Sequence, residues 1–147
     1  MPTLALSIRS IEGKGRGVYT TQDIPSSTLI HISPVILFAV QDSDASSCYH
    51  SVLKEYTYNW TNGCQALALG LGSMFNHSWN HNVGFVRDIK LGVLKYYTIR
   101  DVTADSELCI NYGPNLWFVD VEGNSLKDNN DCSDQCNEEL FLMNIEL

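Results

Sequence analysis

The sequence predicts a β-rich α+β domain, with several short β-strands and one helical insertion in the middle of the chain. Short runs of β-branched and aromatic residues recur through the first 118 residues, separated by glycine, proline and asparagine turns. Residues 41–64 differ, because they begin polar and then carry apolar side chains at helical spacing. At 147 residues, the chain has the length of one domain and enough material for a core.

The strands are expected from alternation or from short, continuous apolar runs. The segments with these patterns are residues 8–11, 17–21, 28–32, 35–40, 83–86 and 91–99. Residues 88–92 are typical of a hairpin turn between the last two strands. In the insertion, Ser46 or Ser47 can cap a helix whose apolar face comprises Tyr49, Leu53, Tyr56 and Trp60.

The negative charge of the chain is concentrated at its C-terminal end. Residues 1–118 hold nine acidic and eight basic side chains, whereas residues 119–147 hold eight acidic side chains and only Lys127. We therefore expect a domain body, 1–118, and an acidic extension, 119–147. The last ten residues place Leu140, Met143 and Leu147 at the spacing of a helix that docks on the body or on a second subunit.

The charge pattern also bears on partners. The body offers no basic surface that could follow phosphates, so direct nucleic-acid binding is not expected. The acidic extension either attracts basic partners or only keeps the chain in solution, and both interpretations stay open.

Cysteine usage and hydropathy indicate an intracellular protein. No apolar run approaches the roughly 20 residues of a membrane helix, and the first residues do not form a signal peptide pattern. The five cysteines are an odd number and are scattered, which favours reduced thiols. Cys132 and Cys136 match zinc-ligand spacing poorly, with no further Cys or His near them. We therefore expect no metal, no membrane association and no secretion.

A glycine run, residues 13–17, lies near the start of the chain. A phosphate-binding P-loop needs Ser or Thr after Gly-Lys, whereas Gly15 follows Lys14 here. A dinucleotide-binding turn opens a helix, whereas residues 18–21 favour a strand. Two interpretations remain: an ordinary hairpin turn, or a main chain that lies flat against a ligand because glycine has no Cβ.

Two further stretches place polar groups against apolar flanks. Residues 75–78 read Phe-Asn-His-Ser, and residues 107–113 read Glu-Leu-Cys-Ile-Asn-Tyr-Gly. The amide of Asn76 and the imidazole of His77 must find hydrogen-bond partners, because burying them unpaired costs several kcal/mol, on the order of 2–7 per group. These stretches are therefore candidates for a polar site in an apolar setting.

In this order, the three stretches resemble the signature motifs of the SET-domain protein-lysine methyltransferases. The family's Asn-His-Ser-Cys-x-Pro-Asn is matched at Asn76, His77, Ser78 and Asn82. The chain departs from the family at Trp79, His81 and Asn111, where Cys, Pro and Asp are more usual. In zinc-bearing members that Cys helps to bind a metal ion together with residues that follow the domain. With Trp79 in its place, the chain resembles the zinc-free members. The resemblance covers about residues 8–118. It implies a SET fold of several short β-sheets with a knot-like C-terminal threading.

The resemblance also implies a site. Tyr112 would be the catalytic tyrosine and S-adenosylmethionine the cofactor. The main chain of residues 15–17 would contact the cofactor's amino-acid end, and Lys14 its carboxylate. The cofactor-binding residues implied are Lys14, Gly15, Arg16, Gly17, Asn76, His77, Tyr112 and Trp117. Trp117 would either stack on adenine or pack in the core, and both interpretations stay open.

Substrate and product are expected from the same resemblance. Phe85 and Ile110 occupy substrate-channel positions and offer no hydroxyl to anchor a water, so we expect the product to exceed monomethyl-lysine. The expected partner is a basic lysine-containing protein, a histone tail in a nuclear setting. The alternatives are a non-histone substrate, also in the cytoplasm, or a SET-fold binding module without turnover. A homodimer is the expected assembly.

Overall fold

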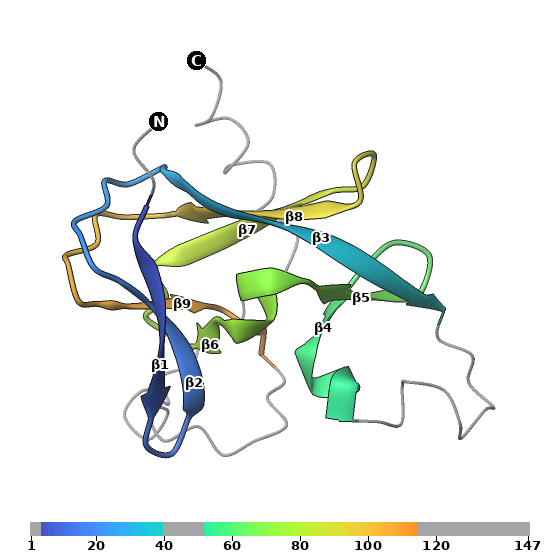
Figure 1. The fold of residues 1–147 in the computed structure, drawn as a ribbon. Coiled ribbons are helices and arrows are strands. Elements are labelled where there is room, and N and C mark those ends of the chain that lie inside the picture. Colours follow the sequence, from blue (N-terminus) through green and yellow to red (C-terminus); the bar gives the residue numbers. More distant parts are fainter. Residues whose placement is uncertain (1–3, 40–51, 115–147) are drawn as a thin grey trace.

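The computed structural model describes residues 4–39 and 52–114, and these form two β-sheets (Figure 1). The four-stranded sheet has the order β1 (Leu6–Ile11), β2 (Gly15–Thr20), β9 (Glu107–Ile110) and β6 (Asn76–His77). The five-stranded sheet has the order β4 (Thr57–Asn59), β5 (Cys64–Ala68), β3 (Leu29–Ala39), β8 (Val93–Thr98) and β7 (Val83–Asp88). The described helices are the short 3-10 turns η2 (Val52–Tyr56) and η3 (Gly70–Met74). The β-rich SET fold is confirmed, and the knot-like threading stays a prediction.

Most expected strands are present, and the glycine run forms a hairpin. β1 and β2 pair from Leu6 with Thr20 to Ile11 with Gly15. Gly13 and Gly15 hold φ angles of 79° and 83°, a left-handed conformation that favours glycine. The hairpin of residues 88–92 is also confirmed, because β7 and β8 pair up to Asp88 and Val93.

The two strands expected at 28–32 and 35–40 are one strand in the structure, β3. Residues up to Pro34 pair with β8, and residues from Val35 onward pair with β5. Pro34 lies where the strand changes partners, a position at which its missing N–H removes no essential bond. Its carbonyl accepts a hydrogen bond from the amide of Leu69 at 2.9 Å. The prediction of two separate strands was wrong for this reason.

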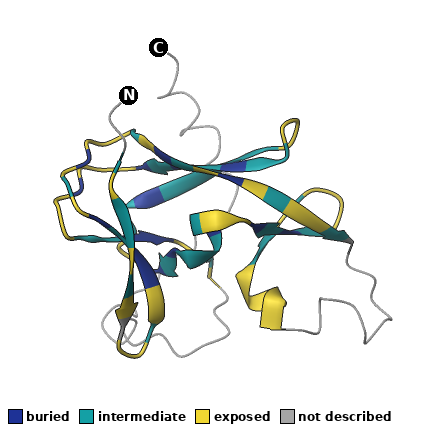
Figure 2. Ribbon diagram, in the orientation of Figure 1, coloured by how far each residue is buried: buried dark blue, intermediate teal, exposed yellow. Residues whose placement is uncertain are grey.

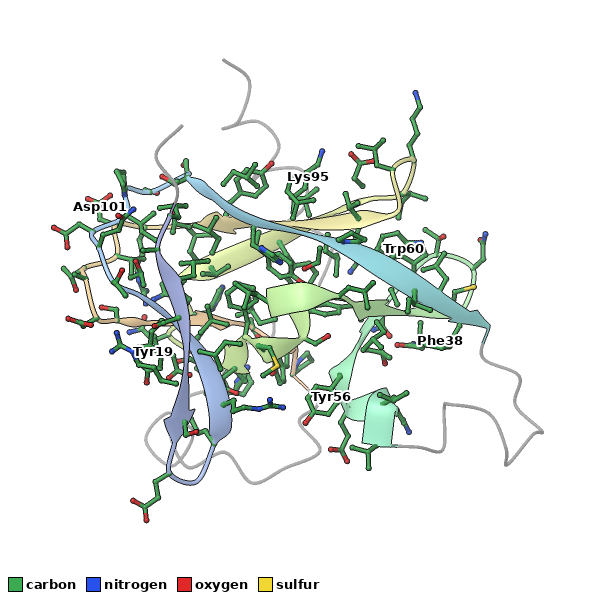
Figure 3. All side chains as sticks on the ribbon, in the orientation of Figure 1. Tyr19, Phe38, Tyr56, Trp60, Lys95 and Asp101 are labelled. Atoms are coloured by element: carbon green, nitrogen blue, oxygen red, sulfur yellow. The ribbon has the colours of Figure 1, made fainter. Side chains whose placement is uncertain are left out.

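The expected helix through Trp60 is also wrong in its described part. Leu53 and Tyr56 lie on η2, but residues 57–59 form β4, which pairs with β5 (Figure 3). The reason is the turn at Asn62 and Gly63, whose φ angles of 55° and 71° close a β4–β5 hairpin. Asn-Gly is a strong hairpin signal that the helical spacing of the aromatic residues concealed. The capping residues Ser46 and Ser47, and Tyr49, lie outside the described residues.

The core collects apolar side chains from both sheets (Figure 2). Val18, Leu108 and Ile110 come from the four-stranded sheet, and Leu94 and Tyr96 from the five-stranded sheet. Burying such a side chain contributes roughly 1.5–3 kcal/mol. The core therefore packs β9 against the five-stranded sheet, where it lies beside β7, and this positions the residues that follow Ile110.

Candidate active site

Strand directions bring the three sequence motifs to one end of the four-stranded sheet. β9 lies between β2, which is antiparallel to it, and β6, which is parallel to it. The start of β2, the end of β6 and the end of β9 therefore lie at the same end of the sheet. The glycine run, His77 and Tyr112 lie at these three strand ends.

The glycine half of β2 has main-chain groups to spare on one side. β1 pairs with all of β2, but β9 pairs only with Val18 and Tyr19. The edge of residues 15–17 that faces away from β1 therefore has no strand partner among the described residues. A Cβ placed on Gly15 would meet no atom within 4 Å, so the space on that face of the hairpin is open. Lys14 is half-buried at the hairpin turn, and Arg16 is exposed.

Asn76 is oriented by a residue of the neighbouring strand. Its Nδ2 donates to Oε1 of Glu107 at 2.8 Å, so its Oδ1 is the group left to turn elsewhere. Glu107 also faces Tyr19, its register partner. Burial raises the pKa of Tyr19, and the negative charge of Glu107 adds to that rise.

His77 is a buried histidine, 5% exposed, with an assigned tautomer. Its Nδ1 accepts a hydrogen bond from the backbone N–H of Tyr112 at 3.1 Å. The ring proton of the neutral imidazole therefore lies on Nε2. The imidazole also packs against the rings of Trp79 and Tyr112, at centroid distances of 4.8 and 5.5 Å. The motif histidine thus holds the main chain of the tyrosine.

Tyr112 is fixed at both its main chain and its side chain. The hydroxyl donates to the carbonyl of Phe75 at 2.6 Å. Burial raises the pKa of the phenol to about 12. Gly113 follows with a φ angle of 95°, and its N–H donates to Oδ1 of Asn111 at 2.8 Å. Asn111 therefore serves the turn that directs Tyr112 toward the core.

An aromatic wall stands beside this tyrosine. Phe85 meets Tyr58 edge-on at a centroid distance of 5.0 Å and lies 6.1 Å from the ring of Tyr96. Burial raises the pKa of Tyr58 well above its ordinary value, and Tyr96 and Tyr112 add to that rise. Ile110 is buried in the core and pairs with His77 across the β6–β9 ladder. The structure thus places Phe85 among the aromatic residues and Ile110 beside the motif histidine.

Asn82 is a motif residue whose structural role the sequence did not indicate. Its side chain donates to the carbonyl of Glu107 at 2.8 Å and accepts from the amide of Cys109 at 2.9 Å. Its own amide donates to the carbonyl of Cys109 at 3.2 Å. Asn82 therefore continues the sheet where β6 has ended. The resemblance to the family motif was the only signal for it.

Tyr58 and Tyr96 were also missed. Both look like ordinary strand residues in the sequence, yet both hydroxyls reach the carbonyl of Gly72. Trp117 lies outside the described residues. Among the residues that the structure describes, no group of three or more His, Cys, Asp and Glu side chains could hold a metal ion.

This architecture agrees with the comparisons to known proteins. The model of the SET domain matches residues 15–113. The chain is 44% identical over 142 residues to the Schizosaccharomyces pombe histone-lysine N-methyltransferase that is H3 lysine-37 specific, covering 97% of this chain and 94% of that protein. A crystal structure from Plasmodium falciparum, assigned as a histone methyltransferase, has a TM-score of 0.60 at 22% identity, covering 80% of this chain and 100% of the other. That likeness shows the fold alone.

The chain therefore belongs to the SET-domain family, and the prediction of a SET-domain methyltransferase is confirmed. In the two described ranges, no helix is long and apolar enough to cross a bilayer.

Proposed function

We propose that the protein transfers methyl groups from S-adenosylmethionine to a histone lysine. The observation that carries this proposal is the placement of Tyr112. Its hydroxyl is held by the Phe75 carbonyl and its amide by His77, at the sheet end where the glycine run begins. The 44% identity to a histone-lysine methyltransferase supports a histone as substrate.

The residues at this sheet end suit the cofactor. The unpaired main-chain edge of Gly15, Arg16 and Gly17 offers N–H and C=O groups to its amino-acid end. Lys14 supplies a positive charge for the carboxylate, and the free amide oxygen of Asn76 can accept from the amino group. The buried imidazole of His77 lies at the same end of the sheet. When bound, the cofactor supplies a methyl group on a positively charged sulfur, with a good leaving group already in place.

We propose that Tyr112 orients the substrate amine and does not deprotonate it. A phenol with its pKa raised to about 12 is neutral at neutral pH. Its hydrogen is used on the Phe75 carbonyl, and a phenol oxygen that donates can also accept, so we propose that it accepts from the amine. The ordinary pKa of a lysine amine is about 10.4, and apolar surroundings such as the side chain of Phe85 lower it. Positioning can then supply most of the acceleration.

We also propose that the product exceeds monomethyl-lysine. Phe85 and Ile110 bring no hydroxyl to the channel. Neither side chain can therefore anchor a water in the place of an added methyl group. Mass spectrometry of a peptide after long incubation tests this. A product that stops at the monomethyl stage contradicts the proposal.

A peptide array identifies the substrate class. We propose a lysine of a histone tail, and the array includes histone H3 peptides centred on Lys-37, the residue named for the relative. The acidic extension fits a basic tail. Labelling of non-histone proteins alone in a cell extract favours the alternative substrate class. Cofactor binding by calorimetry without labelling of any protein favours a binding module.

Location and assembly complete the proposal. A histone substrate places the chain in the nucleus, which microscopy of the tagged protein tests.

We propose a homodimer, because Ile32 and Ile36 lie on one face of β3, opposite the buried Ser33, and are 45% and 46% exposed. Leu69, 41% exposed, extends this apolar surface. A single monomeric species in sedimentation at tens of micromolar contradicts the dimer. We expect no direct binding of nucleic acid.

A further inference from the structure

We propose that Tyr96 is a positioning residue for Tyr112. The hydroxyl of Tyr96 holds the carbonyl of Gly72, and so fixes the η3 turn that presents the Phe75 carbonyl to the Tyr112 hydroxyl. The inference rests on the proposed role of Tyr112 in methyl transfer.

Tyr96 is fully buried in the middle of β8. Its ring packs against that of Phe75 at a centroid distance of 4.8 Å, and its hydroxyl reaches the Gly72 carbonyl at 3.3 Å. A buried hydroxyl without a partner costs about 1–3 kcal/mol. The Gly72 carbonyl is one partner of the Tyr96 hydroxyl, beside the hydroxyls of Tyr58 and Ser33. A phenylalanine would fill nearly the same volume, which means that packing alone does not require the hydroxyl.

A second phenol converges on the same carbonyl. Tyr58, on β4, donates to the Gly72 carbonyl at 2.6 Å. The two donors occupy both lone pairs of the oxygen and tie it to two different strands of the five-stranded sheet. The fit around Gly72 is close, because an added Cβ would lie 2.6 Å from the Tyr96 hydroxyl and 2.7 Å from Cβ of Ala68. The two hydrogen bonds and the close packing therefore fix the position of the Gly72 peptide group.

The turn transmits this position to Tyr112. The η3 turn is also held by Ser73 Oγ, which donates to the Ala68 carbonyl at 2.6 Å, and by the Leu71 amide, which donates to His31 Nε2 at 3.3 Å. Phe75 follows directly after the turn, and its carbonyl accepts the Tyr112 hydroxyl at 2.6 Å. A misplacement of about 1 Å can cost on the order of 100-fold in rate. The hydroxyls of Tyr58 and Tyr96 thus act on the reaction through the Phe75 carbonyl.

Tyr96→Phe tests the proposal in the full chain, with Tyr97→Phe as the matched control. Tyr97 is the next residue on β8, so its side chain projects from the opposite face of the sheet. The first readout needs neither cofactor nor substrate. In protein labelled with ¹³C at tyrosine Cζ, the Tyr112 resonance is assigned by its loss in Tyr112→Phe.

In Tyr96→Phe we expect the Tyr112 resonance to shift. The Cζ resonance reports on the hydrogen bond of the Tyr112 hydroxyl, which changes when the Phe75 carbonyl moves. Tyr97→Phe should leave the resonance unchanged. A Tyr112 resonance that matches wild type in Tyr96→Phe overturns the proposal.

The second readout is the methyl-transfer rate. Tyr96→Phe should lower kcat by about tenfold, since a misplaced acceptor affects the reacting geometry. It should leave the KM for peptide and the affinity for S-adenosylmethionine within about twofold, a split that a general loss of folding would not give. An unchanged kcat in the folded variant overturns the proposal. An inactive wild type with an intact Tyr112 response refutes the proposed function alone. If Tyr96→Phe does not fold, Tyr58→Phe must give the same direction of change.

Discussion

The two sheets of this molecule are built by different rules. In the five-stranded sheet, β7 and β8 pair over six successive residues, and β8 alternates between buried and half-buried positions. In the four-stranded sheet, β9 pairs with β2 over two residues and with β6 over two residues. Side chains complete what these ladders lack, through Asn82, His77 and Asn76. Regular pairing thus supplies the scaffold, and polar side chains that bridge distant segments build the site.

The sharpest break in this comparison is Tyr112→Phe. It removes the hydroxyl that we propose accepts a hydrogen bond from the substrate amine, and it leaves the ring in place, so we expect methyl transfer to fall by about 100-fold or more. The affinity for S-adenosylmethionine, measured by calorimetry, should change by less than about threefold, because the main-chain contacts remain. A variant that keeps more than half of the wild-type rate contradicts the role proposed for Tyr112.

Asn82→Ala tests whether a side chain holds the four-stranded sheet together. The change leaves the amide of Cys109 and the carbonyl of Glu107 without their side-chain partner. We expect the free energy of unfolding to fall by about 2–6 kcal/mol, at about 1–3 kcal/mol for each of the two groups that lose this partner. Chemical denaturation measures this. Asn80→Ala, at an exposed position, is the control and should change it by less than about 1 kcal/mol.

Asn76→Ala tests the proposed cofactor contact of Asn76 without removing β6 from the sheet. The substitution removes the amide that Glu107 orients, so we expect the dissociation constant for S-adenosylmethionine to rise by about tenfold, the cost of one hydrogen bond to a charged group. Calorimetry measures it. Glu107→Gln keeps the shape of the partner and should weaken binding less. Equal affinity in wild type and Asn76→Ala removes Asn76 from the binding site.

The smallest effect belongs to the regular sheet. Lys95 donates to Asp88 at 2.8 Å, and this hydrogen bond lowers the pKa of Asp88. Because the folded pKa lies below the unfolded one, the stabilisation is present above the ordinary value of about 4 and is lost as pH falls through the folded value. Asp88→Asn should therefore lower the Tm slightly at neutral pH and not at all in strong acid. Scanning calorimetry at both pH values checks it, and an equal loss in acid contradicts the assignment.

The sequence predicted what is encoded locally. Alternation located β8, and the glycine spacing located the β1–β2 hairpin. The motif resemblance located Asn76, His77 and Tyr112, and these do lie together. Local patterns failed where a distant partner decides the conformation. Tyr56 and Trp60 have helical spacing, but pairing with β5 makes a strand between them (Figure 3).

The roles of Asn82 and Tyr96 were not predicted for the same reason. Tyr96 sits on a strand that the alternation located, yet nothing local shows that its hydroxyl meets Gly72, 24 residues away. The bonds of Asn82 to β9 span 25 and 27 residues. Such contacts follow from the topology, which single-sequence patterns do not contain.

One of the two inner strands of the four-stranded sheet, β9, is the last strand in the described chain, and this governs when activity can arise. Val18 pairs with Leu108, ninety residues later, so the sheet forms only after a long loop has closed. Pairings of such separation form slowly, and until β9 is inserted β2 and β6 share no neighbour. A partly folded chain can therefore carry the glycine hairpin and still lack a reaction centre. Methyl transfer therefore requires β9 to be docked between β2 and β6.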